Sequence, residues 1–178
     1  MAGEVLDPAA DALLSLAAER PWREIALRDV AEKAGVPFAQ LYALANGKAA
    51  LLAHIAARFD EAALATAATP SDDVHDRLFD AVMARVEAMT PHRDALIAMA
   101  RGGAALALAP HLPRTARAIL EAAGVDPTPP RLAAMTAVWA RTVQVWRDDT
   151  GALNRTMAEI DKRLKQMRGQ LGRIGAGF

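Results

Sequence analysis

The side chains best suited to proton transfer or metal binding are the four histidines, His54, His75, His92 and His111. They are far apart in the sequence, and none forms an HExxH-type pair that would hold zinc from one helical face. Asp72, His75 and Asp76 share a face of a predicted helix, but acidic residues in a first turn also complement the helix dipole. No glycine-rich phosphate loop or nucleophile elbow is present. We therefore expect no catalytic residue, no metal site, no cofactor and no enzyme activity.

A second candidate function, contact with DNA, is indicated by residues 27–51, which have the sequence LRDVAEKAGVPFAQLYALANGKAAL. The pattern predicts a helix over about Leu27 to Ala34, a sharp turn at Gly35 and a second helix opened by Pro37. Two short helices joined by a glycine turn are typical of a helix-turn-helix. The residues that we expect to contact DNA are Arg28, Phe38, Ala39, Gln40, Tyr42 and Lys48.

The helix that would enter the DNA groove has the sequence PFAQLYAL and therefore carries no charge. Gln40 has the side-chain amide that pairs with adenine, and Phe38 or Ala39 can touch a thymine methyl group. Phosphate contacts, which supply much of the affinity, would be made by Arg28, Tyr42 and Lys48. Two interpretations follow: weak DNA binding, or a helix-turn-helix that is retained only for packing.

Composition predicts the elements that must position these residues. Of the 178 residues, 53% are hydrophobic and only 4% are aromatic, and alanine and leucine dominate. Alanine and leucine lose little on entering a helix. Valine and isoleucine nowhere alternate with polar residues, as a half-buried strand requires. We predict an all-α fold of about nine helices.

Targeting signals and charge point to a cytoplasmic protein. There is no cysteine, the N-terminus MAGEVLDPAA lacks the basic start of a signal peptide, and no uncharged apolar run approaches the ~20 residues that span a bilayer. The net charge is zero, but its distribution is uneven. Residues 1–60 contain 6 Lys/Arg and 8 Asp/Glu, a net of −2, whereas residues 150–178 contain 6 and 2, a net of +4. The basic end is therefore not the end with the helix-turn-helix pattern.

The segment TAATPSDD at residues 66–73 is the clearest boundary in the chain, because it combines proline, serine and acidic N-cap residues. It follows a long helix that begins near Lys48. We predict a helix-turn-helix domain at residues 1–47, a connecting helix at 48–66, and a helical ligand-binding and dimerisation domain at 71–178.

The run AMARGGAALALAPHL at residues 98–112 is rich in small side chains. Small side chains fill space poorly, so helices packed around this run leave room for an apolar cavity. Its expected occupant is an apolar small molecule or a lipid. The residues expected to line it are Phe79, Met83, Val86, Met99 and Leu106. The alternative is an ordinary core packed with alanine.

Apolar residues lie close to one face of each of the last two predicted helices. In the final helix they recur at a 4-3-4-3 spacing, as Leu153, Met157, Ile160, Leu164, Met167, Leu171 and Ile174. Such a seam is typical of a coiled-coil-like dimer contact or of plain core. Four basic residues, Lys162, Arg163, Lys165 and Arg168, crowd the other faces. A basic amphipathic helix on an anionic membrane surface is the second interpretation, and dimer packing is the favoured one.

The sequence ALLSLAAERPWREIALRDVAEKAGVPFAQLYALANGKAALL resembles the N-terminal domain of the TetR family of transcriptional regulators, over about residues 11–55. The match includes the Ala-Gly-Val turn, the Leu41-Tyr42 pair and Lys48. The resemblance implies a ligand-responsive regulator that binds palindromic DNA as a homodimer. It also implies that the last two helices pair with those of a second copy. Here that interface would contain Met135, Trp139, Val143, Trp146, Met157, Ile160 and Leu164.

The chain departs from this family at positions that face DNA. Ala26 stands where family members often have threonine or serine before the second helix. Ala43, Leu44 and Ala45 stand where the family usually has a basic residue, histidine and phenylalanine. Loss of the hydroxyl, the basic residue and the histidine removes phosphate contacts, and each missing contact lowers the affinity.

The C-terminal half is similar to the ubiquinone-biosynthesis accessory proteins, which have a TetR-like fold and bind lipids. The similar segments are HDRLFDAVMARVEAMTPHRDAL and WARTVQVWRDDTGALNRTMAEIDKRL. Matching residues include Pro91 with Arg93, Trp146, Asp148-Asp149, Thr156, and Asp161 with Arg163. The leading hypothesis is thus a TetR-type regulator. The alternative is a lipid- or isoprenoid-binding accessory protein with a vestigial helix-turn-helix.

Overall fold

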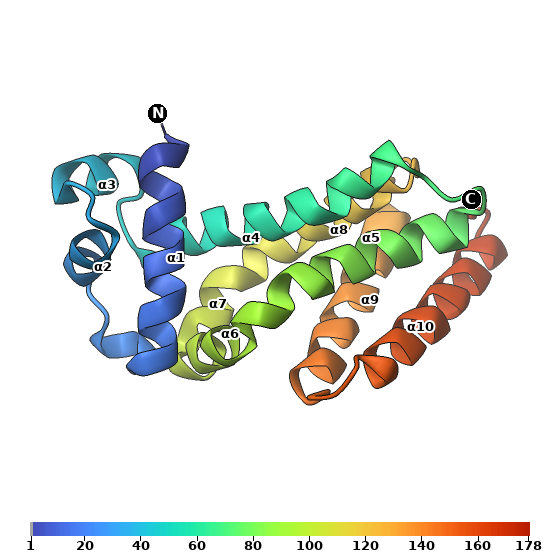
Figure 1. Cartoon of the computed structure of the whole chain (residues 1–178). Helices are drawn as coiled ribbons and strands as arrows, with labels where there is room; N and C mark the ends of the chain where they lie inside the picture. Colours follow the sequence, from blue (N-terminus) through green and yellow to red (C-terminus); the bar gives the residue numbers. More distant parts are fainter. Residues whose placement is uncertain (1) are drawn as a thin grey trace. The chain divides into compact units, whose positions relative to one another are not determined.

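The computed structural model describes residues 2–178, and every regular element in that range is helical (Figure 1). The all-α prediction is confirmed. Short 3-10 and π-helical turns join the α-helices. The α-helices of the described residues are α1 (Gly3–Glu19), α2 (Leu27–Ala34), α3 (Phe38–Leu44), α4 (Lys48–Ala65), α5 (Val74–Met89), α6 (Arg93–Met99), α7 (Ala105–Leu108), α8 (Leu112–Ala122), α9 (Pro129–Arg147) and α10 (Asn154–Arg173).

The chain divides into two compact units. The first contains the residues up to 57 together with 92–110, and the second contains 58–91 and 111–178. The division falls within α4. The first unit thus combines the helix-turn-helix with α6 and α7, which are distant in the sequence. The functional division into residues 1–47, 48–66 and 71–178 follows chain order and stays a prediction.

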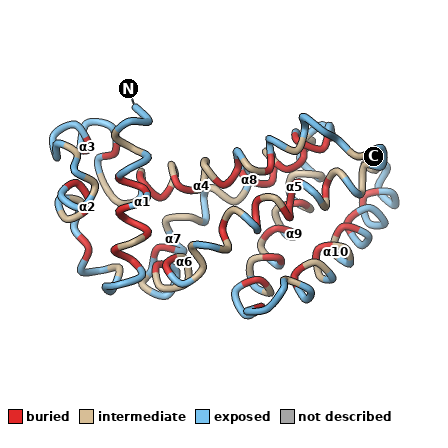
Figure 2. Tube along the Cα trace, viewed as in Figure 1, coloured by how far each residue is buried: buried red, intermediate tan, exposed pale blue. Residues whose placement is uncertain are grey.

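The core of the first unit is built on α1, which packs against α2, α3 and α6. Its inward side chains Leu13, Leu14 and Ala17 are buried, as their helical spacing predicts (Figure 2). The helix begins at Gly3. Pro8 therefore lies inside α1, where it has no N–H for the helical ladder.

The core of the second unit is a helical layer in which α9 packs against both α8 and α10, and α5 packs against the same two helices. Each of these helices buries one face along its length, so the red segments in Figure 2 recur along it. The largest fully buried side chains here are Leu78, Ile119, Leu120, Met135, Ile160 and Leu164.

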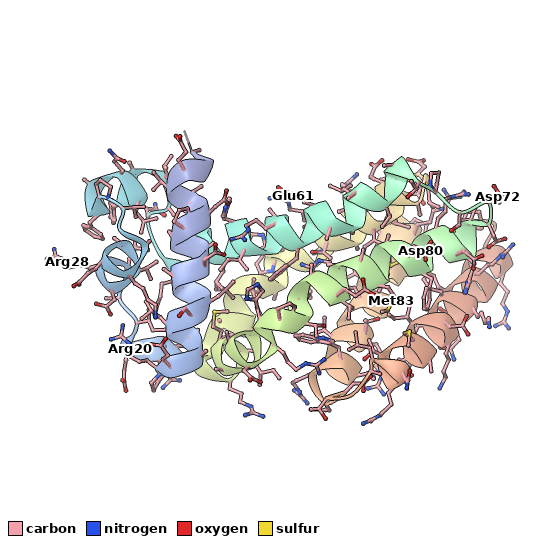
Figure 3. The ribbon with its side chains drawn as sticks, in the orientation of Figure 1. Arg20, Arg28, Glu61, Asp72, Asp80 and Met83 are labelled. Carbon is pink, nitrogen blue, oxygen red and sulfur yellow. The ribbon has the colours of Figure 1, made fainter. Side chains whose placement is uncertain are left out.

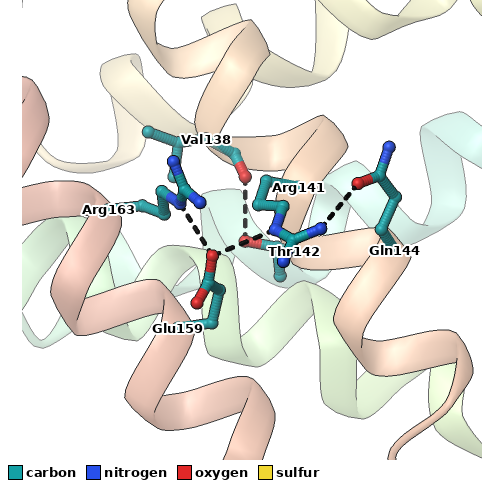
Figure 4. A network of polar contacts seen from close by, with 6 residues as sticks. All are labelled: Val138, Arg141, Thr142, Gln144, Glu159 and Arg163. Atoms are coloured by element: carbon teal, nitrogen blue, oxygen red, sulfur yellow. Dashed lines mark hydrogen bonds and ion pairs between the residues drawn. The ribbon is translucent and has the colours of Figure 1, made fainter.

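Two sets of polar contacts hold α10 in place, one with α9 and one with the loop between the two helices. Glu159 on α10 accepts hydrogen bonds from Arg163 Nε at 2.7 Å and from Arg141 Nε at 3.1 Å (Figure 4). The bond from Arg163 lowers the pKa of Glu159. In the connecting loop, Asp149 Oδ2 accepts from the backbone N–H and the hydroxyl of Thr156, both at 2.8 Å. This carboxylate satisfies an N–H of the first turn of α10, which would otherwise lack a partner.

By length and hydropathy alone, one helical stretch, Val74–Ala122, is apolar enough to cross a membrane. The stretch is not one continuous helix, because Gly103 has a φ of 104° and interrupts it. It also contains Arg85, which forms an ion pair with Asp60 at 2.7 Å in the interior of the second unit. Val74–Ala122 is therefore a series of consecutive helices, of which residues 92–110 belong to the first unit and the rest to the second.

Candidate functional site

The turn between α2 and α3 has the backbone that a helix-turn-helix requires. Gly35 has a φ of 67°, a left-handed conformation in which a side chain would be strained. The Val36 N–H donates to the Ala31 carbonyl, which closes the C-terminus of α2. Val30 and Leu41 are both fully buried and hold the two helices against α1. This packing leaves the opposite side of α3 at the surface.

The N-terminus of α2 is not capped by a hydroxyl side chain. Ala26 has no side-chain acceptor, and its own N–H donates to Asp29 Oδ2 at 3.0 Å. Asp29 also pairs with Arg20, at 3.2 Å. Replacing the hydroxyl residue by Ala26 thus leaves the helix start intact but provides no hydroxyl for a phosphate.

The exposed side of α3 is aromatic and apolar. Tyr42 is 55% exposed and Leu44 45%, and the rings of Phe38 and Tyr42 lie 6.0 Å apart. The guanidinium of Arg28, on α2, lies 5.4 Å from the centre of the Phe38 ring. Figure 3 shows Arg28 directed away from α1. Ala39 and Gln40 are also exposed, so five of the six predicted DNA contacts share an accessible surface.

The sixth predicted contact, Lys48, is engaged within the protein. Its Nζ donates to the Trp22 carbonyl oxygen at 2.6 Å and lies 4.3 Å from the centre of the Trp22 ring. Burial lowers the pKa of the Lys48 ammonium. The sequence pattern placed a cation at the start of α4, but it could not show that a carbonyl group already binds it.

Two other cations near the helix-turn-helix, Lys33 and Arg20, are paired as well. Lys33 Nζ lies 2.9 Å from Glu19 Oε1, and the hydrogen bond from Lys33 lowers the pKa of Glu19. Arg20 pairs with Asp29. Together with the net acidic N-terminal region, these pairs leave Arg28 as the exposed cation that lies beside α3.

The five residues predicted to line a ligand cavity fall in both units. Met83 and Val86 are buried on α5, and Phe79 is half-buried there; Met83 is labelled in Figure 3. Met99 on α6 and Leu106 on α7 belong to the first unit. Leu106 is 83% exposed, so it lines no enclosed cavity in this conformation.

A surface hollow of about 300 Å³ lies elsewhere in the second unit, near the start of α5. Its lining consists of Ala67, Pro70, Arg77, Glu121, Ala122, Ala123 and Gly124, none of which was predicted as a ligand contact. Arg77 donates there to the carbonyl oxygens of Ser71, Asp72 and Ala123. The guanidinium thus joins the loop before α5 to the end of α8, which indicates a structural role.

The interior of the second unit contains a charged pair that sequence reasoning missed. Asp60 and Arg85 are 4% and 5% exposed. Arg85 Nε donates to Asp60 Oδ1 at 2.7 Å, and the Thr115 hydroxyl donates to the same oxygen at 2.9 Å. Burial lowers the pKa of Arg85, and the neighbouring Asp60 opposes that shift. The spacing of Arg85 could have indicated that it is buried, because it lies between Val82 and Met89 in the apolar stripe of α5.

Most side chains of the predicted dimer seam are buried within the single chain. Five of its seven residues are at most 2% exposed: Met135, Trp139, Trp146, Ile160 and Leu164. Trp146 Nε1 also donates to the hydroxyl of Thr90, at 3.1 Å. The remaining two, Val143 and Met157, are half-buried. A surface for a second copy therefore requires the side chains of α9 and α10 that remain accessible.

The acidic cluster before α5 serves the helix start. Asp73 is the N-cap and accepts from the His75 N–H at 2.7 Å, while His75 Nε2 lies 2.9 Å from Asp161 Oδ1 on α10. Asp72 and Asp76 are exposed. Among residues 2–178, no group of histidine and acidic side chains is arranged to hold a metal ion.

Comparison with solved structures identifies the arrangement. The chain is similar to a TetR transcriptional regulator from Rhodococcus sp. RHA1, with a TM-score of 0.70 over 92% of this chain and 95% of that chain. The chain has a TetR-like fold. The two sequences are 17% identical, so the likeness establishes the fold alone. No protein-family model matches the chain, and no curated protein matches it. Similarity to the ubiquinone-biosynthesis accessory proteins stays a prediction.

Proposed function

We propose that this protein is a TetR-type, ligand-responsive transcriptional regulator, rather than an enzyme, and that it acts in the cytoplasm as a homodimer on palindromic DNA. The observation that carries the proposal is the helix-turn-helix turn at Gly35, which presents the exposed side chains of α3 beside Arg28. A second helix displayed in this way is the element that enters the major groove in such proteins. The TetR-like fold supports the proposal.

Base recognition in this proposal depends on three exposed residues of α3. Gln40 provides a bidentate donor and acceptor pair for adenine, and one such pair contributes about 1–3 kcal/mol of discrimination. Phe38 and Ala39 provide apolar contact for a thymine methyl group. The hydroxyl of Tyr42 and the guanidinium of Arg28 remain for phosphates. Few charged contacts imply weak binding with modest sequence selectivity.

Fluorescence anisotropy with the DNA upstream of the protein's own gene tests this function. At about 50 mM salt even non-specific binding is measurable for a DNA-binding protein. Gln40→Ala should remove the preference at one base pair per half-site and leave the affinity for unrelated DNA unchanged. Ser15→Ala, on α1, is the matched control and should change neither. A folded dimer that shows no DNA binding at this salt concentration would contradict the proposal.

The dimer surface in this proposal lies on the accessible faces of α9 and α10, around the half-buried Val143 and Met157. Placing a charge there is unfavourable if the surface is covered by a second copy. Val143→Glu should therefore convert a dimer into a monomer in sedimentation experiments. Gln166→Glu, which makes a new charge at an exposed position of α10, should leave the mass unchanged. A wild-type monomer at micromolar concentration would exclude the dimer.

The ligand in this proposal is an apolar small molecule or lipid that binds in the core of the second unit, against Phe79, Met83 and Val86. Methionine side chains adapt to differently shaped apolar ligands. A ligand that binds only the folded protein stabilises it by about 2.7 kcal/mol when its concentration is 100 times Kd. A rise in melting temperature with apolar compounds, measured beside native mass spectrometry of the purified protein, tests this part.

One observation favours a second function, a lipid-binding accessory protein that does not bind DNA. The helix α3 has no charged residue, and Lys48 is bound to the Trp22 carbonyl. In that case the basic, amphipathic α10 would be the element that meets a membrane surface. Retained lipid in native mass spectra, together with no DNA binding at about 50 mM salt, would favour this function over the first.

A further inference from the structure

One carboxylate oxygen in the interior of the second unit has no hydrogen-bond donor. Asp60, on α4, is 4% exposed, and both donors that reach it, Arg85 Nε and the Thr115 hydroxyl, bind its Oδ1. Its Oδ2 is fully enclosed and has no hydrogen-bond partner among residues 2–178. Buried acceptors are nearly always satisfied in folded proteins, by a protein group, a water or a ligand. We therefore expect Oδ2 to accept a hydrogen bond from a group other than the described residues.

The charge around Asp60 limits what that donor can be. The guanidinium of Arg85 already compensates the charge of the carboxylate, and both groups are buried. A cation beside Oδ2 would leave one uncompensated positive charge in the core, which is strongly unfavourable. An anion would be repelled by Oδ2 itself. A neutral O–H donor satisfies the oxygen and adds no charge.

The surroundings of the pair are apolar and aromatic. The guanidinium carbon of Arg85 lies 4.4 Å from the centre of the Trp139 ring and 5.9 Å from that of Phe59. Arg85 Nη1 lies 2.8 Å from the Met89 sulfur. A molecule that brings a hydroxyl group to Oδ2 must therefore have an apolar body. Because Oδ2 is enclosed, such a molecule enters only when side chains move, and Met89, which contacts Arg85, is a flexible side chain beside the pair.

We propose that Asp60 Oδ2 accepts a hydrogen bond from the hydroxyl group of an apolar alcohol or phenol bound within the second unit. The inference rests on the proposed ligand function and names the chemistry of the ligand. Arg85 is the positioning residue, because its Nε holds Oδ1 and so turns Oδ2 toward the ligand. A water molecule offers the same O–H chemistry, and the experiment separates it from a ligand.

The test compares two probes that differ only in the donor, para-hexylphenol and its methyl ether, by calorimetry and thermal denaturation of the full chain. The phenol is neutral at pH 7, since its pKa is about 10. We expect the phenol to raise the melting temperature and to bind about tenfold to a hundredfold more tightly than the ether, as the loss of one bond to a charged acceptor implies. Decanol and decyl methyl ether form a second pair with a different body.

Variants assign the difference to Asp60. Asp60→Asn replaces the acceptor at Oδ2 by an amide donor and should make phenol and ether bind alike. If that variant does not fold because Arg85 is left unpaired, Asp60→Asn with Arg85→Gln removes both charges and serves the same purpose. Asp80→Asn, an exposed carboxylate on α5 that accepts from Ser71, is the control and should keep the difference.

Three results would overturn the inference. Equal binding of hydroxyl compound and ether to the wild type overturns the inference and leaves the apolar-ligand function standing. No binding of either pair overturns both. An ordered water that stays on Oδ2 in a crystal of the phenol complex shows that water is the donor, and it also overturns the inference.

Discussion

The ammonium group of Lys48 binds the backbone of Trp22 and lies over its ring, with Nζ 2.6 Å from the carbonyl oxygen and 4.3 Å from the ring centre. The Cβ of Trp22 in turn lies directly against Gly102, in the π-helical turn η4 (Ala100–Ala104). The first residue of α4 is thereby connected to η4 through one tryptophan. A cation in this position contributes to the stability of the first unit and is only partly available to a phosphate.

Lys48→Ala should lower both stability and DNA affinity. It removes a hydrogen bond and a cation–π contact, together worth about 1 kcal/mol of unfolding free energy. Arg28→Ala should weaken DNA binding with little change in stability, since Arg28 is exposed. Urea denaturation and anisotropy, measured on both variants, check this contrast. Lys33→Ala, which removes a surface pair with Glu19, is the control for loss of a lysine. Unchanged stability of Lys48→Ala would show that the contact with Trp22 is not formed in solution.

The salt dependence of DNA binding should be shallow. Three phosphate contacts per half-site, as the sequence predicts, would give a log–log slope of roughly −5 for a dimer. Tyr42 has no charge and Lys48 is engaged by Trp22, so at most two cations per half-site release counterions. We expect a slope no steeper than about −4. Anisotropy titrations between about 50 and 200 mM salt measure it, and a slope of −5 or steeper would mean that cations other than Arg28 and Lys48 contact phosphates.

Gly102→Ala should destabilise the first unit by about 1–3 kcal/mol, the usual effect of an overpacked contact. A Cβ at this position would lie 2.5 Å from the Trp22 Cβ, which is too close for either backbone to stay in place. Because Trp22 holds Lys48, DNA affinity should fall as well. Gly169→Ala on α10 is the matched control: a Cβ there meets nothing within 4 Å, and stability should rise by about 0.5–1 kcal/mol. Equal effects of the two substitutions on denaturant unfolding would contradict the steric argument.

Asp149 should make the protein less stable in acid. Burial alone would raise the pKa of this carboxyl, but the hydrogen bonds from Thr156 and Gly151 lower it below its ordinary value. A lowered folded pKa contributes stability above the unfolded pKa of about 3.9, and this contribution is lost as the pH falls through the folded pKa.

Asp149→Asn should therefore cost about 1–2 kcal/mol between roughly pH 5 and pH 7, and progressively less below about pH 4. Urea unfolding as a function of pH gives the difference between the variant and the wild type. Asp148→Asn, at the neighbouring exposed carboxylate, should show no comparable loss. A difference that does not change with pH would mean that Asp149 is not held as an anion in the folded protein.

The sequence by itself determined the helices and the turn between α2 and α3. Local signals suffice for these elements: alanine and leucine favour helix, and glycine at position 35 adopts the left-handed φ without strain. The predicted span of α2 and the start of α4 agree with the structure. Proline is typical of the first helical turn, but Pro8 lies inside α1, so this local signal does not mark where the helix begins.

Only the tertiary structure decided which partners the side chains meet. The apolar stripe of α9 and α10 is compatible with a dimer seam or a protomer core, and burial of Trp139 and Ile160 within one chain assigns them to the core. Asp60 and Arg85 are 25 residues apart, and their sequence spacing does not show that the two side chains meet in the folded protein. Periodicity shows which face of a helix is apolar, but it does not show what covers that face. That depends on contacts between distant segments, which local sequence patterns do not specify.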